Sequence, residues 1–93
     1  MRKLIRADGT TQDLPAPLSI EKCEQLIHAD TLDTVNLRHM GEPRHVMLLD
    51  DLGHKQGLPV NTEATALYHA NCRPGTTHQI RGDVIVVPDS DFS

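Results

Sequence analysis

The sequence is poor in aromatic residues, with no Trp, one Tyr and one Phe among 93 residues. Aromatic side chains bury the largest area per residue, so their scarcity excludes a core built on stacked rings. A chain of this length forms one domain, residues 1–93, that buries roughly 60–65% of its unfolded surface. Leu, Ile, Val and Met must supply that core. Because small cores are often stabilised by self-association, we expect a homodimer or a higher oligomer.

Clustered cations and long apolar runs are also lacking. Nine Lys and Arg face thirteen Asp and Glu, which gives a formal net charge of −4. The basic cluster is Arg2, Lys3 and Arg6, and the overall acidity argues against a nucleic-acid partner. No run approaches the ~20 apolar residues of a membrane span, so we expect no membrane partner. Residues 1–20 lack a signal-type apolar core, which favours a cytoplasmic location.

The six histidines do not show the spacing of a metal site. Neither Cys-x-x-Cys nor His-x-x-x-His occurs, although paired ligands at close spacing are typical of zinc sites. Cys23 lies at an apolar helix position and is expected in the core, whereas Cys72 follows in a loop. The pair Asp50 and Asp51 precedes the turn at Gly53, where Asp is common for backbone reasons. We therefore expect no metal, no cofactor and no catalytic residue.

The hydrophobic pattern predicts two helices and several short strands. Residues 19–29 form an amphipathic helix that Ser19 caps, and Asn61 or Thr62 caps a second helix. Residues 84–87 are continuously apolar and β-branched, which indicates a central strand covered on both faces. The remaining strands are expected at residues 3–6, 32–39 and 44–49, with optional short ones at 10–14 and 54–57.

This order, β(β)αββ(β)αβ, predicts the α+β class. We expect a mostly antiparallel sheet with the two helices packed on one of its faces. Ala64, Leu67 and Tyr68 share one side of the second helix, and this ridge should lie against the strand at residues 84–87. Residues 89–93 are expected to be a polar tail.

The start of the second helix is the best candidate for a small anionic ligand. A helix N-terminus presents free N–H groups, and Asn61, Thr62 and Thr65 add polar side chains that Arg73 and Arg81 could approach from the following loop. The alternative interpretation is structural: Asn61 or Thr62 caps the helix, and Thr65 packs or bonds back along it.

Three segments carry a resemblance to a known family. Residues 57–61 read Gly-Leu-Pro-Val-Asn, residues 64–68 read Ala-Thr-Ala-Leu-Tyr, and residues 80–87 read Ile-Arg-Gly-Asp-Val-Ile-Val-Val. Over residues 57–87 the chain resembles a small family of uncharacterised proteins found in bacteriophages, prophages and plasmids. The loop before Ile80 departs from that pattern. The resemblance implies the cytoplasm of a bacterial host and an accessory role, and it supplies no catalytic residues.

The sequence therefore favours a non-enzymatic accessory protein of phage or mobile-element type that binds a host protein. That function predicts a contiguous exposed apolar patch. The alternative is an oligomeric module that sequesters a small anionic ligand such as a nucleotide. A hydrolase that uses Asp50 or Asp51 is the third interpretation, which the turn context of both residues disfavours.

Overall fold

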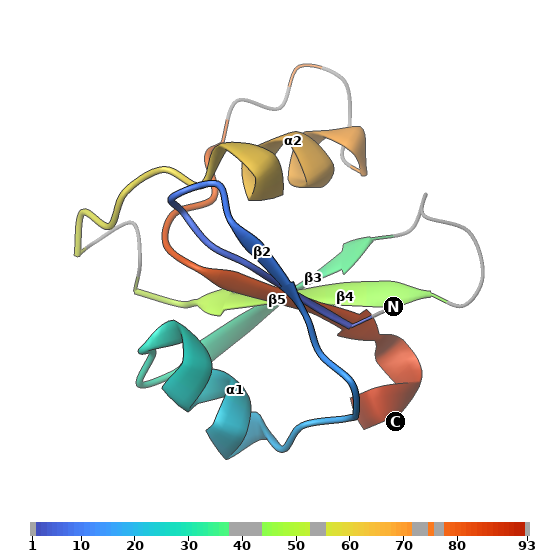
Figure 1. Cartoon of the computed structure of the whole chain (residues 1–93). Coiled ribbons are helices and arrows are strands. Elements are labelled where there is room, and N and C mark those ends of the chain that lie inside the picture. The colour runs from blue at the N-terminus through green and yellow to red at the C-terminus, as the bar shows by residue number, and fades with distance from the viewer. Residues whose placement is uncertain (1, 38–43, 53–55, 72–74, 76–77, 93) are drawn as a thin grey trace.

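The computed structural model describes residues 2–37, 44–52, 56–71, 75 and 78–92. They form a five-stranded antiparallel sheet between two helices (Figure 1), so the predicted α+β class and antiparallel pairing are confirmed. In chain order the elements are β1 (Lys3–Ile5), β2 (Thr11–Asp13), α1 (Ile20–Ile27), β3 (Leu32–Leu37), β4 (His45–Asp50), α2 (Thr62–Ala70), β5 (Val84–Pro88) and the 3-10 helix η1 (Asp89–Phe92).

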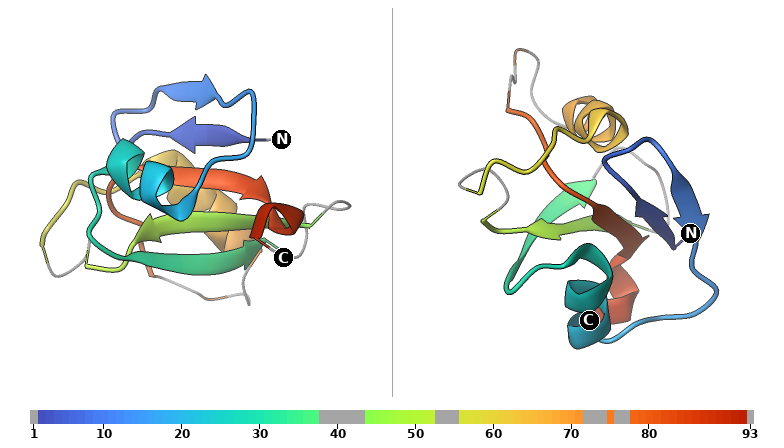
Figure 2. Two further views of the ribbon diagram at one scale, coloured as in Figure 1. Left: turned by 90° about the horizontal axis from the view of Figure 1, so that it is seen from below. Right: turned by 60° about the vertical axis from the view of Figure 1, so that its left-hand side comes forward.

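The last strand of the chain lies at the centre of the sheet. The strand order is β2-β1-β5-β4-β3, which leaves β2 and β3 at the two edges (Figure 2). All five residues of β5 are buried. Because successive side chains on a strand point to opposite faces, β5 is covered on both sides. The predicted central strand at residues 84–87 is confirmed.

The two helices lie on opposite faces of the sheet, as Figure 1 shows. The prediction that both pack on one face is wrong. Neighbouring residues of β5 belong to different apolar clusters, and each cluster has its own helix. On the α1 side the buried residues are Leu4, Leu14, Cys23, Ile27, Ala29, Leu48, Ile85 and Val87. On the α2 side they are Ile5, Leu37, Met47, Leu49, Ala64, Ile80, Val84 and Val86.

Predictions for α1 and the cysteines can be compared with the structure residue by residue. The Ser19 hydroxyl accepts a hydrogen bond from the Lys22 N–H at 3.2 Å and caps α1. The helix ends at Ile27, close to the predicted end near residues 28–30, because His28 takes the left-handed conformation with φ of 57° as the C-cap. Cys23 is a buried free thiol, and burial raises its pKa. Cys72 lies outside the described residues.

The apolar ridge of α2, formed by Ala64, Leu67 and Tyr68, packs on the side of β5 as predicted. Ala64 is fully buried, and Leu67 and Tyr68 pack against the same cluster as Val84 and Val86. The optional strand at residues 10–14 forms as β2. The optional strand at residues 54–57 does not form at residues 56–57, which make a turn, and residues 54–55 lie outside the described part of the chain.

An ion pair joins Arg2, the residue before β1, to the last helical turn. Residues 89–92, expected as part of a polar tail, form η1. Arg2 donates through Nε and Nη2 to the two carboxylate oxygens of Asp91, each at 2.8 Å. The Asp91 side chain is only 4% exposed, and the hydrogen bonds from Arg2 lower its pKa. Charge-assisted bidentate pairs of this kind are strong and directional.

The lowered pKa of Asp91 predicts a pH-dependent contribution to stability. The folded protein holds this carboxylate ionised below the ordinary Asp pKa of about 3.9. Its stabilisation is therefore present above that value and is lost as the pH falls through the folded pKa. We expect Asp91→Asn to lower the free energy of unfolding at neutral pH, with the difference from the original chain shrinking below about pH 4. Urea denaturation across this range measures it.

The matched control is Asp30→Asn, which removes an exposed carboxylate. It should cost little at any of these pH values. A difference between Asp91→Asn and the original chain that stays constant into acid would contradict the assigned role of the ion pair.

Candidate functional site

Asn61 is a buried structural residue at the start of α2. Its side chain is 1% exposed. Its Oδ1 accepts the Ala64 N–H at 3.0 Å, and its Nδ2 donates to the carbonyls of Ile5 and Gly82, each at 3.0 Å. The predicted helix cap is confirmed, and it is Asn61 rather than Thr62. Both amide protons and the amide oxygen have partners within the chain, so Asn61 is not presented to a ligand.

The other predicted ligand residues differ in whether their polar groups are bonded within the chain. The Thr65 hydroxyl accepts the Ile80 N–H at 2.9 Å and lies 3.3 Å from the Ile80 carbonyl, so it bonds across to the strand side and not back along α2. Thr62 is exposed in the first turn. Arg81 donates through Nη1 to the Leu58 carbonyl at 2.9 Å, and its buried Nε has no hydrogen-bond partner among the described residues. Arg73 lies outside the described residues.

Arg81 belongs to a small depression at one end of the β3–β4 pair. This acidic depression has a volume of about 160 Å³ and is lined by Asp33, Leu49, Asp50, Asp51, His78, Gln79 and Arg81. Asp50 is 5% exposed, and its Oδ1 accepts the Leu52 N–H at 2.9 Å, which confirms its predicted turn role. Asp33 and Asp51 are exposed. Within the described ranges no ion pair joins Arg81 to these carboxylates.

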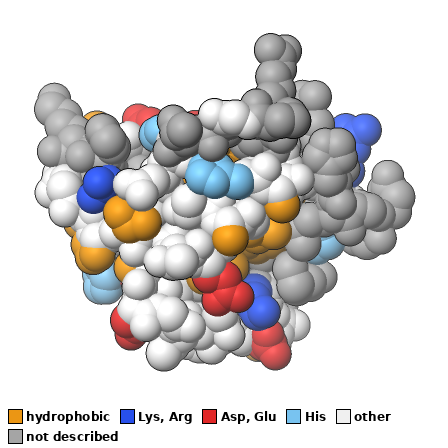
Figure 3. Space-filling view, turned by 90° about the horizontal axis from the view of Figure 1, so that it is seen from above, with side chains coloured by type: hydrophobic (Ala, Val, Ile, Leu, Met, Phe, Trp, Pro, Cys, Tyr) orange, Lys and Arg blue, Asp and Glu red, His pale blue; other side chains and the backbone are white. Residues whose placement is uncertain are grey.

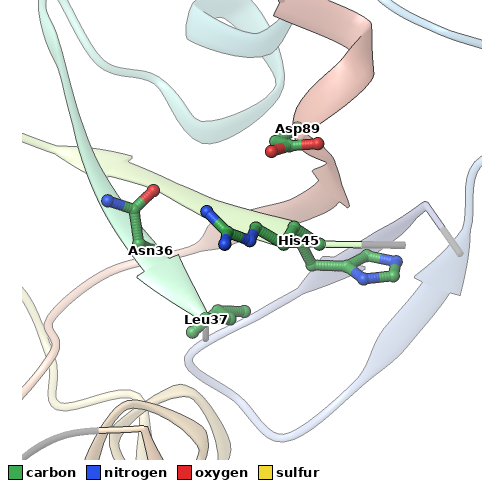
Figure 4. A pocket seen from close by; sticks show the side chains of 5 residues that line it. Asn36, Leu37, His45 and Asp89 are labelled. Carbon is green, nitrogen blue, oxygen red and sulfur yellow. The ribbon is translucent and has the colours of Figure 1, made fainter. Parts of the chain in front are cut away.

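A second depression lies at the opposite end of β3. It has a volume of about 320 Å³ and is lined by Asn36, Leu37, Arg44, His45 and Asp89. In Figure 4 the side chains of Asn36 and Asp89 lie on the same side of the sheet, whereas the ring of His45 points away from them. The Asp89 N–H donates to the Arg44 carbonyl at 2.8 Å. With one guanidinium and one carboxylate in its lining, this depression does not favour one sign of charge.

Between the two depressions runs β3, the outermost strand on that side of the sheet (Figure 2). The Asp51 N–H donates to the Thr31 carbonyl at 3.2 Å. In an antiparallel pair, hydrogen-bonded positions alternate with non-bonded ones, and Leu32 is opposite Asp50. The backbone groups of Leu32, Thr34 and Asn36 therefore point away from β4, off the edge of the sheet.

One of these outward groups is already occupied. The Thr34 N–H donates to Asp33 Oδ1 at 2.9 Å. No strand among the described residues pairs with the outer side of β3. The N–H groups of Leu32 and Asn36, and the three outward carbonyls, thus form an edge of the kind that pairs with another extended segment.

Exposed apolar side chains are few in the part of the chain that the structure describes. The large ones are Ile20, 46% exposed, and Leu52, 38% exposed. Figure 3, which views the α2 face, shows hydrophobic side chains in small separate groups. Ile20 begins α1 and Leu52 follows β4, and the contiguous apolar patch predicted for protein binding stays a prediction. The backbone edge of β3 has no strand partner among the described residues.

Two further findings concern membranes and metals. None of the helices in the described ranges is long and apolar enough to cross a membrane. In the same ranges, no group of three or more His, Cys, Asp or Glu side chains is arranged to hold a metal ion.

Comparisons of the chain with protein-family models, with curated proteins and with solved structures found no match. The resemblance over residues 57–87 therefore stays a prediction. The half-buried strand predicted at residues 32–39 is confirmed over Leu32–Leu37, and residues 38–39 lie outside the described part of the chain. Its place at the edge of the sheet was not predicted, because alternation does not encode strand order.

Replacing Asn61 tests its structural role. Asn61→Ala removes the cap and leaves two buried carbonyls without the amide, so we expect the free energy of unfolding to fall by about 2–4 kcal/mol. Thr62→Ala, at the next and exposed position, should change it by less than about 0.5 kcal/mol. Urea denaturation followed by circular dichroism compares the two variants. Equal losses would contradict the assignment.

Proposed function

We propose that this protein is a non-enzymatic binding protein that takes up an extended segment of a partner protein along β3. The observation that carries the proposal is the outward-facing backbone of Leu32, Thr34 and Asn36 on an edge strand without a described neighbour. Adding a strand to an open sheet edge gives affinity through main-chain hydrogen bonds, and side-chain pockets give specificity. This mode does not depend on a large exposed apolar area.

The opposite edge of the sheet is a poorer template. β2 has three residues, Thr11–Asp13, whereas β3 has six. Where β1 pairs with β2, the Arg6 N–H donates to the Thr10 carbonyl. Hydrogen-bonded positions alternate with non-bonded ones along an antiparallel pair, so the backbone groups of Thr11 and Asp13 point away from β1, off the edge of the sheet. Two outward positions in a short strand provide fewer main-chain bonds than three in a longer one. We therefore assign partner binding to β3.

The alternative function, an oligomeric module that sequesters a small anionic ligand such as a nucleotide, has less support. Two of its proposed ligand residues, Asn61 and Thr65, use their polar groups within the chain. Arg81 remains, but beside three carboxylates, which oppose an anion. The phage or mobile-element origin, the bacterial cytoplasm and a host protein as partner are parts of this proposal that come from the resemblance.

A proline at an outward-facing position tests strand addition directly. Asn36→Pro removes an N–H that points away from β4, so the β3–β4 ladder is kept while the edge is blocked. We expect proteins captured from bacterial lysate by the original chain to be lost with Asn36→Pro. Quantitative mass spectrometry of the captured proteins is the measurement.

Two controls separate the edge from other effects. Asn36→Ala changes the same side chain but keeps the N–H, and Thr11→Pro makes the same change at an outward position of the opposite edge. Both should retain the partner. In the complex, the amides of Leu32 and Asn36 should exchange hydrogen more slowly, and those of β2 should not. A partner that binds Asn36→Pro as well as the original chain, or no captured protein at all, would refute the proposal.

A further inference from the structure

We infer that the segment bound along β3 is basic: it places a Lys or Arg side chain against the acidic depression and an apolar side chain two residues away. This inference rests on the proposed function and names the chemistry of the partner. It follows from which side chains of β3 share a face, from the charges at the Leu32 end of the strand, and from the loss of water that strand addition causes.

The faces of β3 are fixed by its register. Val35 and Leu37 belong to or pack against the α2-side cluster, and Asp33 lies on the same face because alternate residues of a strand do so. Leu32 packs on the α1 side, and so Thr34 and Asn36 face that way. A neighbouring strand therefore meets, on the α2 face, first the carboxylate of Asp33 and then the partly buried Val35.

The charge at the Asp33 end is predominantly negative. The exposed acidic residues Asp33 and Asp51 line the acidic depression together with Arg81. Asp50 also borders it, but its side chain alternates with Leu49 and faces the α1 side. The guanidinium of Arg81 is directed to the Leu58 carbonyl through Nη1, and no ion pair with the carboxylates is present in the described residues. The field of the whole chain has the same sign, since its formal net charge is −4. Such a field steers a cationic segment towards the edge.

Strand addition makes this charge decisive. A strand laid beside β3 removes water from the exposed carboxylate of Asp33. Removing water from an ionised group is costly unless an opposite charge or a hydrogen-bond donor replaces it. An apolar or acidic residue opposite Asp33 therefore weakens binding, whereas a Lys or Arg at this position offsets the cost. Cross-strand pairs of opposite charge stabilise a sheet for the same reason.

The same reasoning disfavours a second copy of this chain as the occupant. Two antiparallel β3 strands related by a two-fold axis preserve the faces of the sheet, so Asp33 meets Asp33, Val35 or Leu37 of the other copy, depending on the register. None of these side chains compensates a carboxylate. Among the described residues, Arg44 lines the second depression, at the other end of β3. It precedes β4 on the α1 face, because it alternates with His45, which shares the α2 face with Met47.

The order of the basic and apolar residues in the bound segment indicates whether it runs parallel or antiparallel to β3. Side chains two residues apart share a face, so the segment carries its basic and apolar residues at positions i and i+2. An antiparallel segment reads apolar-x-basic, because its chain runs against β3, and a parallel segment reads basic-x-apolar. The positions opposite Thr34 and Asn36 face the α1 side and are expected to be polar.

A displayed library of random twelve-residue peptides tests the inference. Peptides selected on the original chain should share a Lys or Arg two positions from Val, Ile or Leu. For a selected peptide, Kd should rise roughly three- to ten-fold in the double variant Asp33→Asn, Asp51→Asn. Fluorescence anisotropy at low salt measures Kd. Asn at position 33 keeps an oxygen for the Thr34 N–H, so the edge itself is unchanged.

The matched control is the double variant Asp13→Asn, Glu21→Gln, which makes the same change in net charge at exposed positions of β2 and α1. It should leave Kd within about two-fold of the original value. Equal weakening by both double variants would overturn a specific role of the acidic depression.

The remaining outcomes separate the inference from the function on which it rests. Selected peptides that are lost with Asn36→Pro but show no basic residue overturn the inference and leave strand addition standing. Peptides that bind Asn36→Pro unchanged, or a library that yields none, overturn both. Light scattering after size exclusion adds a final test: a dimer that becomes a monomer in Asn36→Pro shows that a second copy occupies β3, which overturns the inference.

Discussion

Both faces of β5 are apolar, and the arrangement of the domain follows from this constraint. Its five residues are buried in sequence, so each face of the sheet centre must be shielded from water. The chain has two α-helices among its described residues, and one covers each face. With the centre closed, the sheet contacts its surroundings through its two edge strands, and these are where the molecule can pair with other chains.

The second constraint is the three-way junction at Asn61. One side chain caps α2, holds the end of β1 through Ile5 and fixes the turn before β5 through Gly82. Gly82 takes a φ of 80°, and a Cβ there would come within 2.9 Å of Leu58, so the turn is both left-handed and tightly approached. The junction explains why polar residues in this region serve the fold rather than a ligand.

The sequence was most informative where one side chain or one short pattern decides the structure. The cap at Ser19, the cap at Asn61 and the buried ribbon at residues 84–87 were predictable, because local hydrogen bonds or uninterrupted burial specify them. The placement of the helices on two faces was not, and neither was the position of β3 at an edge. Both depend on the order of strands, which pairing between distant segments sets. The acidic depression was missed for the same reason, since Asp33 and Arg81 meet only in the folded sheet.

An edge that accepts a partner also invites unwanted pairing, because exposed strands are templates for aggregation. The carboxylate of Asp33 bears on that hazard. By taking the Thr34 N–H at 2.9 Å, it occupies the central donor of β3 and places a negative charge beside it. Like molecules at high concentration then repel one another at this strand. If β3 binds a basic segment as we propose, the same acidic side chain opposes pairing between copies of the chain and favours the oppositely charged partner.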